Sequence, residues 1–233
     1  MASSSSVQEA GVPPAGLRAW KKARTRTTIS DVATGLFMRD GFEAVTVAQI
    51  AAAAEVSVKT VFNYFPSKED LFFDRVDDVI GALVDAVVER PTGQTIVDAL
   101  HGVLADRLVP FDADGWRRLR DAEHYERFRR FLATEEASPA LRTRRLVIAE
   151  LWTARLAQLF AQQLGLPTGD PRAATLAAMV VAAMTLRSRT LSAAMAERLS
   201  ARTVERRVRA VVDEAFQRLA IAFADVDLPR AAA

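Results

Sequence analysis

The segment 58–65 predicts a short helix that presents four polar residues on one side. Its apolar residues recur at i, i+3, i+4 and i+7, a spacing typical of an inner helix face. The inner face is expected to hold Val58, Val61, Phe62 and Phe65. The outward face then holds Lys59, Thr60, Asn63 and Tyr64. Lysine can donate to guanine, asparagine can pair with adenine through two hydrogen bonds, and tyrosine can reach a phosphate, so this face suits duplex DNA.

Helix-start signals flank that segment on both sides. Thr46 with Gln49 fits a capping box, Ser57 can cap the helix that begins at Val58, and Ser67 with Asp70 fits a further capping box. In the first turns of helices, hydroxyl groups and free N–H groups can also bind phosphate. Thr46, Ser57 and Lys68 are therefore candidate phosphate contacts, although each also fits a purely structural role as a cap or a surface charge.

Helical periodicity continues through most of the chain, and no stretch alternates polar and apolar residues over the length of a strand. The sequence predicts an all-α fold of about nine helices. The first has a stripe from Ile29 to Phe37 and stops at Gly41, and the fourth runs from Ser67 to about Arg90. The later helices are expected over residues 94–109, 114–134, 139–164, 171–197 and 203–224.

Positive charge is concentrated near the N-terminus. The 233 residues carry a net charge of only +2, yet no acid occurs between Glu9 and Asp31. The basic residues of that interval are Arg18, Lys21, Lys22, Arg24 and Arg26. This pattern suits a polyanion such as DNA, and the alternative is a solvated basic tail.

Composition argues against several classes of protein. The chain has no cysteine, which excludes disulfide scaffolds, thiol catalysis and cysteine-ligated metals. No apolar run is long enough to span a bilayer and no secretion signal is evident, so a cytoplasmic protein is expected. A Gly-rich phosphate loop, HExxH and GxSxG are all missing, and His101 and His124 are too few for an obvious metal site. We expect neither a cofactor nor an enzyme, and a helical enzyme is the weaker alternative.

The stretch from Phe42 to Leu71, FEAVTVAQIAAAAEVSVKTVFNYFPSKEDL, resembles the signature of the TetR family of regulators. The resemblance implies a homodimer whose recognition helices occupy successive major grooves of a palindromic operator. It also implies DNA contacts at Thr46, Ser57, Lys59, Thr60, Asn63, Tyr64 and Lys68. Glu55 stands where the family usually has a turn glycine, and Phe62 replaces a common tyrosine, so the docking angle can differ.

Four regions follow from this organisation. We expect a disordered basic arm over residues 1–21, a helix-turn-helix domain over 22–84 with its motif at about 46–65, an effector-binding and dimerisation domain over 85–226, and a disordered tail over 227–233. The fourth helix is expected to join the two domains and to act as a lever between them.

The last two helices carry wide apolar surfaces, which predicts half of a four-helix dimer interface. The residues expected there are Met179, Val180, Ala183, Val208, Val212 and Phe216. The alternative is a purely intramolecular core.

Aromatic and polar residues of the middle helices could line a small-molecule pocket, or could simply be core. They are Trp116, His124, Tyr125, Phe128, Phe131 and Trp152. The run around Ser138-Pro139 and Trp152 is similar to a C-terminal domain of a TetR subgroup associated with acyl-CoA-like ligands. That resemblance implies phosphate contacts at Arg142, Arg144 or Arg145, unless these arginines form a solvated face.

These features together predict a ligand-responsive repressor that leaves its operator when a small apolar or acyl-CoA-like effector binds. A regulator without a small-molecule effector is the alternative.

Overall fold

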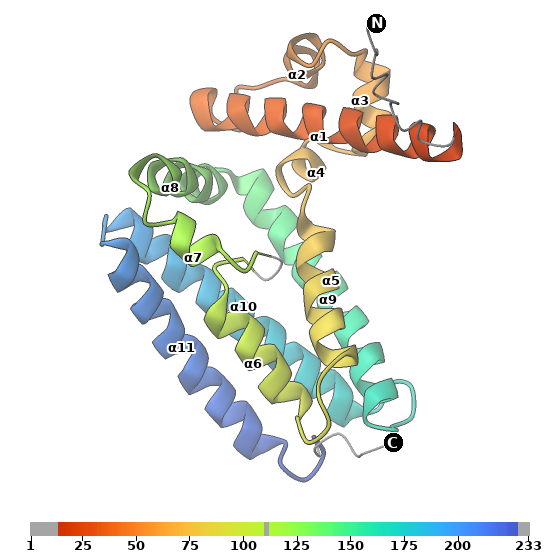
Figure 1. The fold of residues 1–233 in the computed structure, drawn as a ribbon, viewed down its shortest axis with the longest axis vertical. Coiled ribbons are helices and arrows are strands. Elements are labelled where there is room, and N and C mark those ends of the chain that lie inside the picture. Colours follow the sequence, from red (N-terminus) through yellow and green to blue (C-terminus); the bar gives the residue numbers. More distant parts are fainter. Residues whose placement is uncertain (1–13, 110–111, 228–233) are drawn as a thin grey trace, which may run out of the picture. The chain divides into compact units, whose positions relative to one another are not determined.

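A computed structural model describes residues 14–109 and 112–227, and all regular elements within them are α-helices (Figure 1). The all-α prediction is confirmed, with eleven helices in the described residues where about nine were expected. The chain divides into two compact units, Met1–Phe72 and Phe73–Ala233. The boundary therefore lies about a dozen residues before the one predicted at residue 84.

The first unit holds four helices around one small core. They are α1 (Pro14–Asp40), α2 (Val47–Ala53), α3 (Val58–Tyr64) and α4 (Lys68–Phe72). Helix α1 packs against α2 and α4, and α2 packs against α3. At the centre, the Phe37 ring centroid lies 4.9 Å from that of Phe42 and 6.1 Å from that of Phe72. Burial of large aromatic side chains dominates the stability of so small a core.

The predicted start signals form as hydrogen bonds. Thr46 caps α2 through a capping box, in which its side chain accepts from the Gln49 N–H and the Gln49 side chain accepts from the Thr46 N–H. Ser57 Oγ accepts from the Thr60 N–H at 3.0 Å, and Ser67 Oγ accepts from the Asp70 N–H at 3.1 Å. These bonds satisfy N–H groups that have no partner within their helices and fix where each short helix begins.

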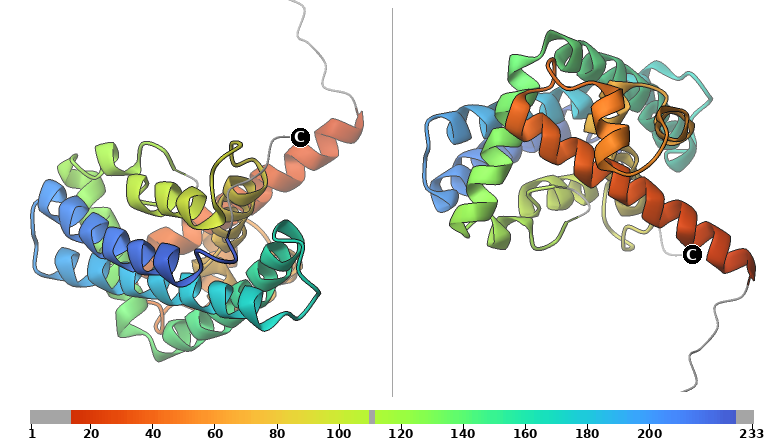
Figure 2. Two further views of the ribbon diagram at one scale, coloured as in Figure 1. Left: turned by 90° about the horizontal axis from the view of Figure 1, so that it is seen from below. Right: turned by 90° about the horizontal axis from the view of Figure 1, so that it is seen from above.

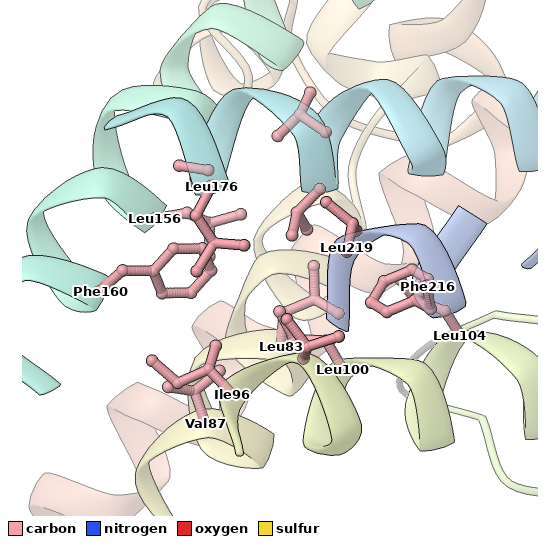
Figure 3. Close-up of a cluster of buried hydrophobic side chains, with 14 of the residues drawn as sticks. Leu83, Val87, Ile96, Leu100, Leu104, Leu156, Phe160, Leu176, Phe216 and Leu219 are labelled. Carbon is pink, nitrogen blue, oxygen red and sulfur yellow. The ribbon is translucent and has the colours of Figure 1, made fainter. Parts of the chain in front are cut away.

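The second unit is a helical bundle. Its helices are α5 (Val76–Val88), α6 (Ile96–Asp106), α7 (Gly115–Arg118), α8 (Ala122–Ala137), α9 (Pro139–Gln163), α10 (Pro171–Ala196) and α11 (Ala201–Ala222). Helix α10 packs against α8, α9 and α11, while α6 packs against α5 and α11. Leucine, isoleucine, valine and phenylalanine side chains from α5, α6, α9, α10 and α11 meet in the core (Figure 3).

Arg187 lies inside this bundle, with 7% of its surface exposed. Its guanidinium donates to the carbonyls of Leu104, Arg107 and Leu108, which lie at or just after the C-terminal end of α6. Burial lowers the pKa of Arg187 to about 10, so the side chain remains protonated at neutral pH. The charge therefore ties α10 to the negative end of the α6 dipole.

Three predicted boundaries differ from the structure. The expected fourth helix is interrupted at 73–75, between α4 and α5. The helix expected over 114–134 is two helices, α7 and α8, because Asp121 caps α8 by accepting from the His124 N–H at 2.8 Å. Residues 14–21, expected to be disordered, belong to α1. Residues 1–13 and 228–233 of the expected disordered ends lie outside the described residues.

Candidate nucleic-acid interface

Helix α3 presents the predicted polar face only in part. Lys59 and Asn63 are exposed, whereas Thr60 and Tyr64 are half-buried. The Thr60 hydroxyl lies 2.8 Å from Ser57 Oγ, and the Tyr64 carbonyl accepts from the Arg26 guanidinium at 3.2 Å. Lys59 and Asn63 are one helical turn apart, so their side chains lie on the same side of α3.

The expected inner face of α3 is wrong at two of its four positions. Val61 and Phe65 are buried, but Val58 is 40% exposed and Phe62 is 48% exposed. In this short helix only one residue per turn reaches the small core. Val58 and Phe62, which are also one turn apart, therefore face outward. The exposed surface of α3 therefore combines a cation, an amide and two apolar side chains.

Lys68 is engaged within the first unit. Its ammonium group donates to the carbonyls of Phe42 at 2.9 Å and Val45 at 3.1 Å, and lies 4.2 Å from the centroid of the Phe42 ring. Two of its three N–H donors thus hold the segment between α1 and α2. One donor is left for a phosphate, so the side chain is first of all a structural clamp.

Arg26 is a site residue that the motif did not reveal. Its guanidinium lies 4.3 Å from the centroid of the Phe65 ring and donates to the Tyr64 carbonyl. These contacts join α1 to the C-terminal end of α3. The sequence placed Arg26 only among the basic residues near the N-terminus, because a cation that packs on an aromatic ring 39 positions away leaves no local pattern.

The turn between α2 and α3 keeps its shape without the glycine of the TetR signature. Glu55 has a φ of 55°, the left-handed conformation that favours glycine. The Val56 N–H donates to the Ala51 carbonyl at 2.9 Å and the Glu55 N–H donates to the Ala52 carbonyl at 3.2 Å. Both bonds belong to a Schellman-type helix ending, so the backbone is strained rather than rebuilt.

The structure places the six residues predicted for an effector pocket in different surroundings. Trp116 is buried in a cluster against which Tyr125, Phe128 and Phe131 pack, whereas Trp152 packs against the other core cluster of the second unit. His124 is half-buried beside Arg127, and burial lowers its pKa. None of the six lines either of the two cavities described below.

Four of the six residues predicted at a dimer interface are buried within the protomer. Val180, Val208, Val212 and Phe216 expose 2% or less of their surface, because α11 packs on α6 and α10 of the same chain. They cannot form a surface between two copies. Met179 is 40% exposed and Ala183 is half-buried.

A different apolar surface lies on the outer sides of α9 and α10. Its large side chains, each at least 40% exposed, are Leu146, Val147, Leu151, Met179 and Leu186. Exposed alanines at 178, 182, 193 and 196 extend it along α10. We call these residues the α9–α10 face. Large exposed apolar side chains gathered on two packed helices are a candidate interaction surface.

Two cavities of the second unit differ in charge. The larger, about 960 Å³, lies along α5 and α6. Five carboxylates and three guanidinium groups line it: Asp77, Asp78, Asp85, Glu89 and Asp106 with Arg75, Arg90 and Arg107. The smaller, about 610 Å³, lies between α9 and α10. Its charged lining is Arg142, Arg145, Arg189 and Glu136, and its apolar lining is Leu146 with the alanines at 149, 193 and 196.

Within the described residues, no helix combines the length and apolar character needed to cross a membrane. The same residues contain no group of three or more potential metal ligands of the histidine, cysteine or carboxylate type.

Short capped helices, a turn and an exposed polar helix face define a helix-turn-helix DNA-binding protein. Residues 29–74 match the family "Bacterial regulatory proteins, tetR family". TcmR, an HTH-type transcriptional regulator of Streptomyces glaucescens, is 31% identical over 155 residues, covering 66% of this chain and 67% of TcmR. The chain belongs to the TetR family of DNA-binding transcriptional regulators, which are not enzymes.

Two further proteins are similar over different extents. LuxR, an HTH-type transcriptional regulator of Vibrio harveyi, is 41% identical over 71 residues, covering 28% of this chain and 33% of LuxR. The structure of GusR from Salmonella enterica has a TM-score of 0.46 and 20% sequence identity, covering 83% of this chain and 96% of GusR.

Proposed function

We propose that this chain is a homodimeric repressor that binds a palindromic operator and is released by an anionic, partly apolar effector of the acyl-CoA class. The observation that carries the DNA-binding part is the exposed face of α3. Lys59 and Asn63 supply a cation and an amide on a helix short enough to enter the major groove, which is about 12 Å wide. As a bacterial DNA-binding protein, it would act in the cytoplasm.

The contacts within this proposal divide by chemistry. Asn63 reads a base, since an asparagine amide can both donate to and accept from adenine, and Lys59 donates to guanine or phosphate. Exposed Val58 and Phe62 pack on thymine methyl groups or sugars. Thr46, Ser57, Thr60, Tyr64 and the remaining N–H of Lys68 bind phosphate, which positions the helix.

The test is a gel shift on the DNA that flanks the gene for this protein, with and without acyl-CoA thioesters. Asn63→Ala should relax the base preference and keep the salt dependence, because it removes a base contact and no charge. Lys59→Ala should weaken binding and flatten the salt dependence. A wild-type protein that prefers no sequence in that DNA would contradict the proposal.

The α9–α10 face supports the choice of dimer surface. Apart from Arg189, the exposed side of α10 between Ala173 and Ala196 carries no charge. On α9, the exposed Glu150 and Arg155 have no ion-pair partner within the described residues, so both remain available to a second copy. An apolar centre with charges at its margin is typical of an interface between identical chains.

Exchange of Leu151 and Leu186 for aspartate tests this surface. We expect the double variant to be monomeric by light scattering and to lose operator binding, because it buries two unpaired carboxylates. Ile221→Asp is the matched control, since Ile221 is 74% exposed on α11, outside the α9–α10 face. A double variant that remains as dimeric as the control would overturn the assignment.

Charge supports the smaller cavity as the effector site. Arg145 is paired with Glu135 and Glu136, but Arg142 and Arg189 form no ion pair within the described residues, which favours an anion. Leu146 with neighbouring alanines can cover an apolar chain. The larger cavity carries an excess of carboxylates, which disfavours a phosphorylated ligand. Two of the three arginines suggested by the acyl-CoA resemblance, Arg142 and Arg145, line the smaller cavity.

A further inference from the structure

The stretch of α1 over residues 19–24 carries positive charge and is exposed. Residues 19–24 are all exposed, and the first fully buried side chain of α1 is Ile29. Lys21, Lys22 and Arg24 lie in this exposed part. The core of the first unit therefore does not account for this stretch of helix.

These three cations have no carboxylate near them. Within the described residues none forms an ion pair, and the sequence has no acid between Glu9 and Asp31. The Arg24 guanidinium lies 5.4 Å from the ring centroid of Trp20, which is itself 53% exposed. A cation over an exposed ring keeps most of its donors free for another acceptor.

The helix gains little stability of its own in this part. A helix N-terminus favours negative side chains, and the first turn of α1 contains none. Neighbouring cations on an isolated helix repel each other, which disfavours the helix further. A polyanion alongside would reverse both effects.

The position of the exposed part follows from Arg26, which contacts the C-terminal end of α3. Lys22 precedes Arg26 by one helical turn and so lies on the same side of α1. From Arg26 to Lys21, the most distant of the three cations, the helix extends about 8 Å at 1.5 Å per residue. Figures 1 and 2 show the N-terminal end of α1 continuing past α3.

We propose that Lys21, Lys22 and Arg24 bind the phosphate backbone of duplex DNA outside the base pairs that face α3. This inference rests on the proposed function, because it places the cations beside an operator that α3 occupies. The roughly 8 Å between Arg26 and Lys21 corresponds to about two base pairs at 3.4 Å each. Lysine and arginine side chains on phosphate add affinity without reading sequence, so the contact lengthens the footprint and leaves base preference unchanged.

The test uses the full chain and the duplex from the flank of its own gene that wild-type protein protects in footprinting. The triple variant Lys21→Ala/Lys22→Ala/Arg24→Ala keeps α1 helical, because alanine has the highest helix propensity. The slope of log binding constant against log salt concentration should be smaller in magnitude by roughly 2–3 per protomer, because three phosphate contacts are lost. Affinity at fixed salt should fall while the ranking of operator variants stays the same.

Shortening the duplex distinguishes phosphate contacts at its ends from a general loss of positive charge in the triple variant. When the outermost base pairs beyond those that face α3, roughly two at each end, are removed, wild-type affinity should fall to that of the triple variant, whose own affinity should hardly change. Arg202→Ala/Arg206→Ala is the matched control, because both side chains are exposed on α11 in the other unit. It should behave like wild type.

Equal salt dependence and equal response to trimming in wild type and triple variant would overturn the inference and leave the proposed function intact. Failure of the wild type to prefer any duplex would overturn both. A triple variant with altered ranking of operator variants would assign these side chains to base reading and so contradict the phosphate contact.

Discussion

Glu55 shows how one residue can hold a turn that its side chain disfavours. Its positive φ places an ordinary L-residue where glycine has no steric penalty, and the two hydrogen bonds after α2 keep it there. Arg198, between α10 and α11, has the same φ of 55° and the same bonding pattern, with the Leu199 N–H donating to the Ala194 carbonyl. Because the side chains differ, the backbone hydrogen bonds that end each helix maintain the strained conformation.

We therefore predict that Glu55→Gly stabilises the first unit by about 0.5–1 kcal/mol. The substitution removes the left-handed strain of the folded state, and the greater entropy of glycine in the unfolded chain offsets only part of that gain. Urea unfolding followed by circular dichroism measures the change. Glu55→Ala is the control, since it removes the charge and keeps the strain. If alanine stabilised the unit as much as glycine, charge and not backbone conformation would be responsible.

Substitution of Lys59 and of Lys68 should have opposite effects on folding stability and on DNA binding, although both are lysines near α3. Lys68→Met keeps the side-chain stem but leaves the Phe42 and Val45 carbonyls without their donor, so the first unit should lose about 1–3 kcal/mol of stability. Lys59→Met should leave stability unchanged within about 0.5 kcal/mol and reduce the salt dependence of DNA binding. Thermal unfolding and binding titrations on the same two variants distinguish them, and a Lys68 variant of full stability would refute the clamp.

The sequence predicts the helix caps and the exposure of Lys59 and Asn63 on α3, but not the exposure of its apolar residues. The caps at Thr46 and Ser57 use partners three residues away, so their pattern is local and the structure confirms it. Val58 and Phe62 fit the spacing of an inner face equally well, yet they are exposed. An apolar residue that meets a partner molecule has the same sequence pattern as one that meets the core.

At the scale of elements, the predictions fail where a helix breaks without proline or glycine. Apolar spacing continues from Leu71 and Phe72 into Val76 and Ile80, so nothing in the pattern indicates the interruption at 73–75. The break before α8 had a signal, because an aspartate at 121 followed by Glu123 is a helix start. Three residues predicted at the dimer interface, Val208, Val212 and Phe216, are buried for a related reason: the wide apolar surface of α11 is covered by α6 and α10 of the same chain.

The junction of α8 and α9 holds a buried ion pair. Arg145 Nε donates to Glu135 Oε1 at 2.6 Å, and Glu135 exposes only 7% of its surface. Burial raises the pKa of the Glu135 carboxyl, and the attraction of Arg145 opposes that shift only in part. The folded protein therefore binds this proton more tightly than the unfolded chain does.

The sign of the resulting pH dependence is fixed by linkage. Between the ordinary glutamate pKa and the raised folded value, the free energy of unfolding contributed by Glu135 falls as pH rises, by at most about 1.4 kcal/mol per pH unit. We predict that wild type gains stability relative to Glu135→Gln as pH falls through this window. Urea unfolding of both proteins at several pH values measures the difference. A difference that moves in favour of Glu135→Gln on acidification would contradict the raised pKa.

At the scale of the molecule, the proposed effector cavity and the proposed dimer surface share side chains. Leu146 belongs both to the lining of the smaller cavity and to the α9–α10 face, and Arg189 lines the cavity from the exposed side of α10. An effector bound there would lie at the edge of the contact between two copies. In the proposed repressor, a change in that contact would alter the spacing of the two recognition helices, which a palindromic operator requires to be constant.

This arrangement predicts reciprocal coupling between effector and operator. If an acyl-CoA thioester weakens operator binding by some factor, the operator must weaken thioester binding by the same factor, about 5–150-fold for typical couplings. Calorimetric titration of the thioester into free protein and into the protein–operator complex measures both affinities, with an unrelated duplex as control. Arg189→Ala should weaken thioester binding in the free protein, because it removes one of three cavity cations, while operator affinity without effector persists. Equal thioester affinity in the free and operator-bound states would show that the ligand does not control release, even if the dimer binds its operator through α3.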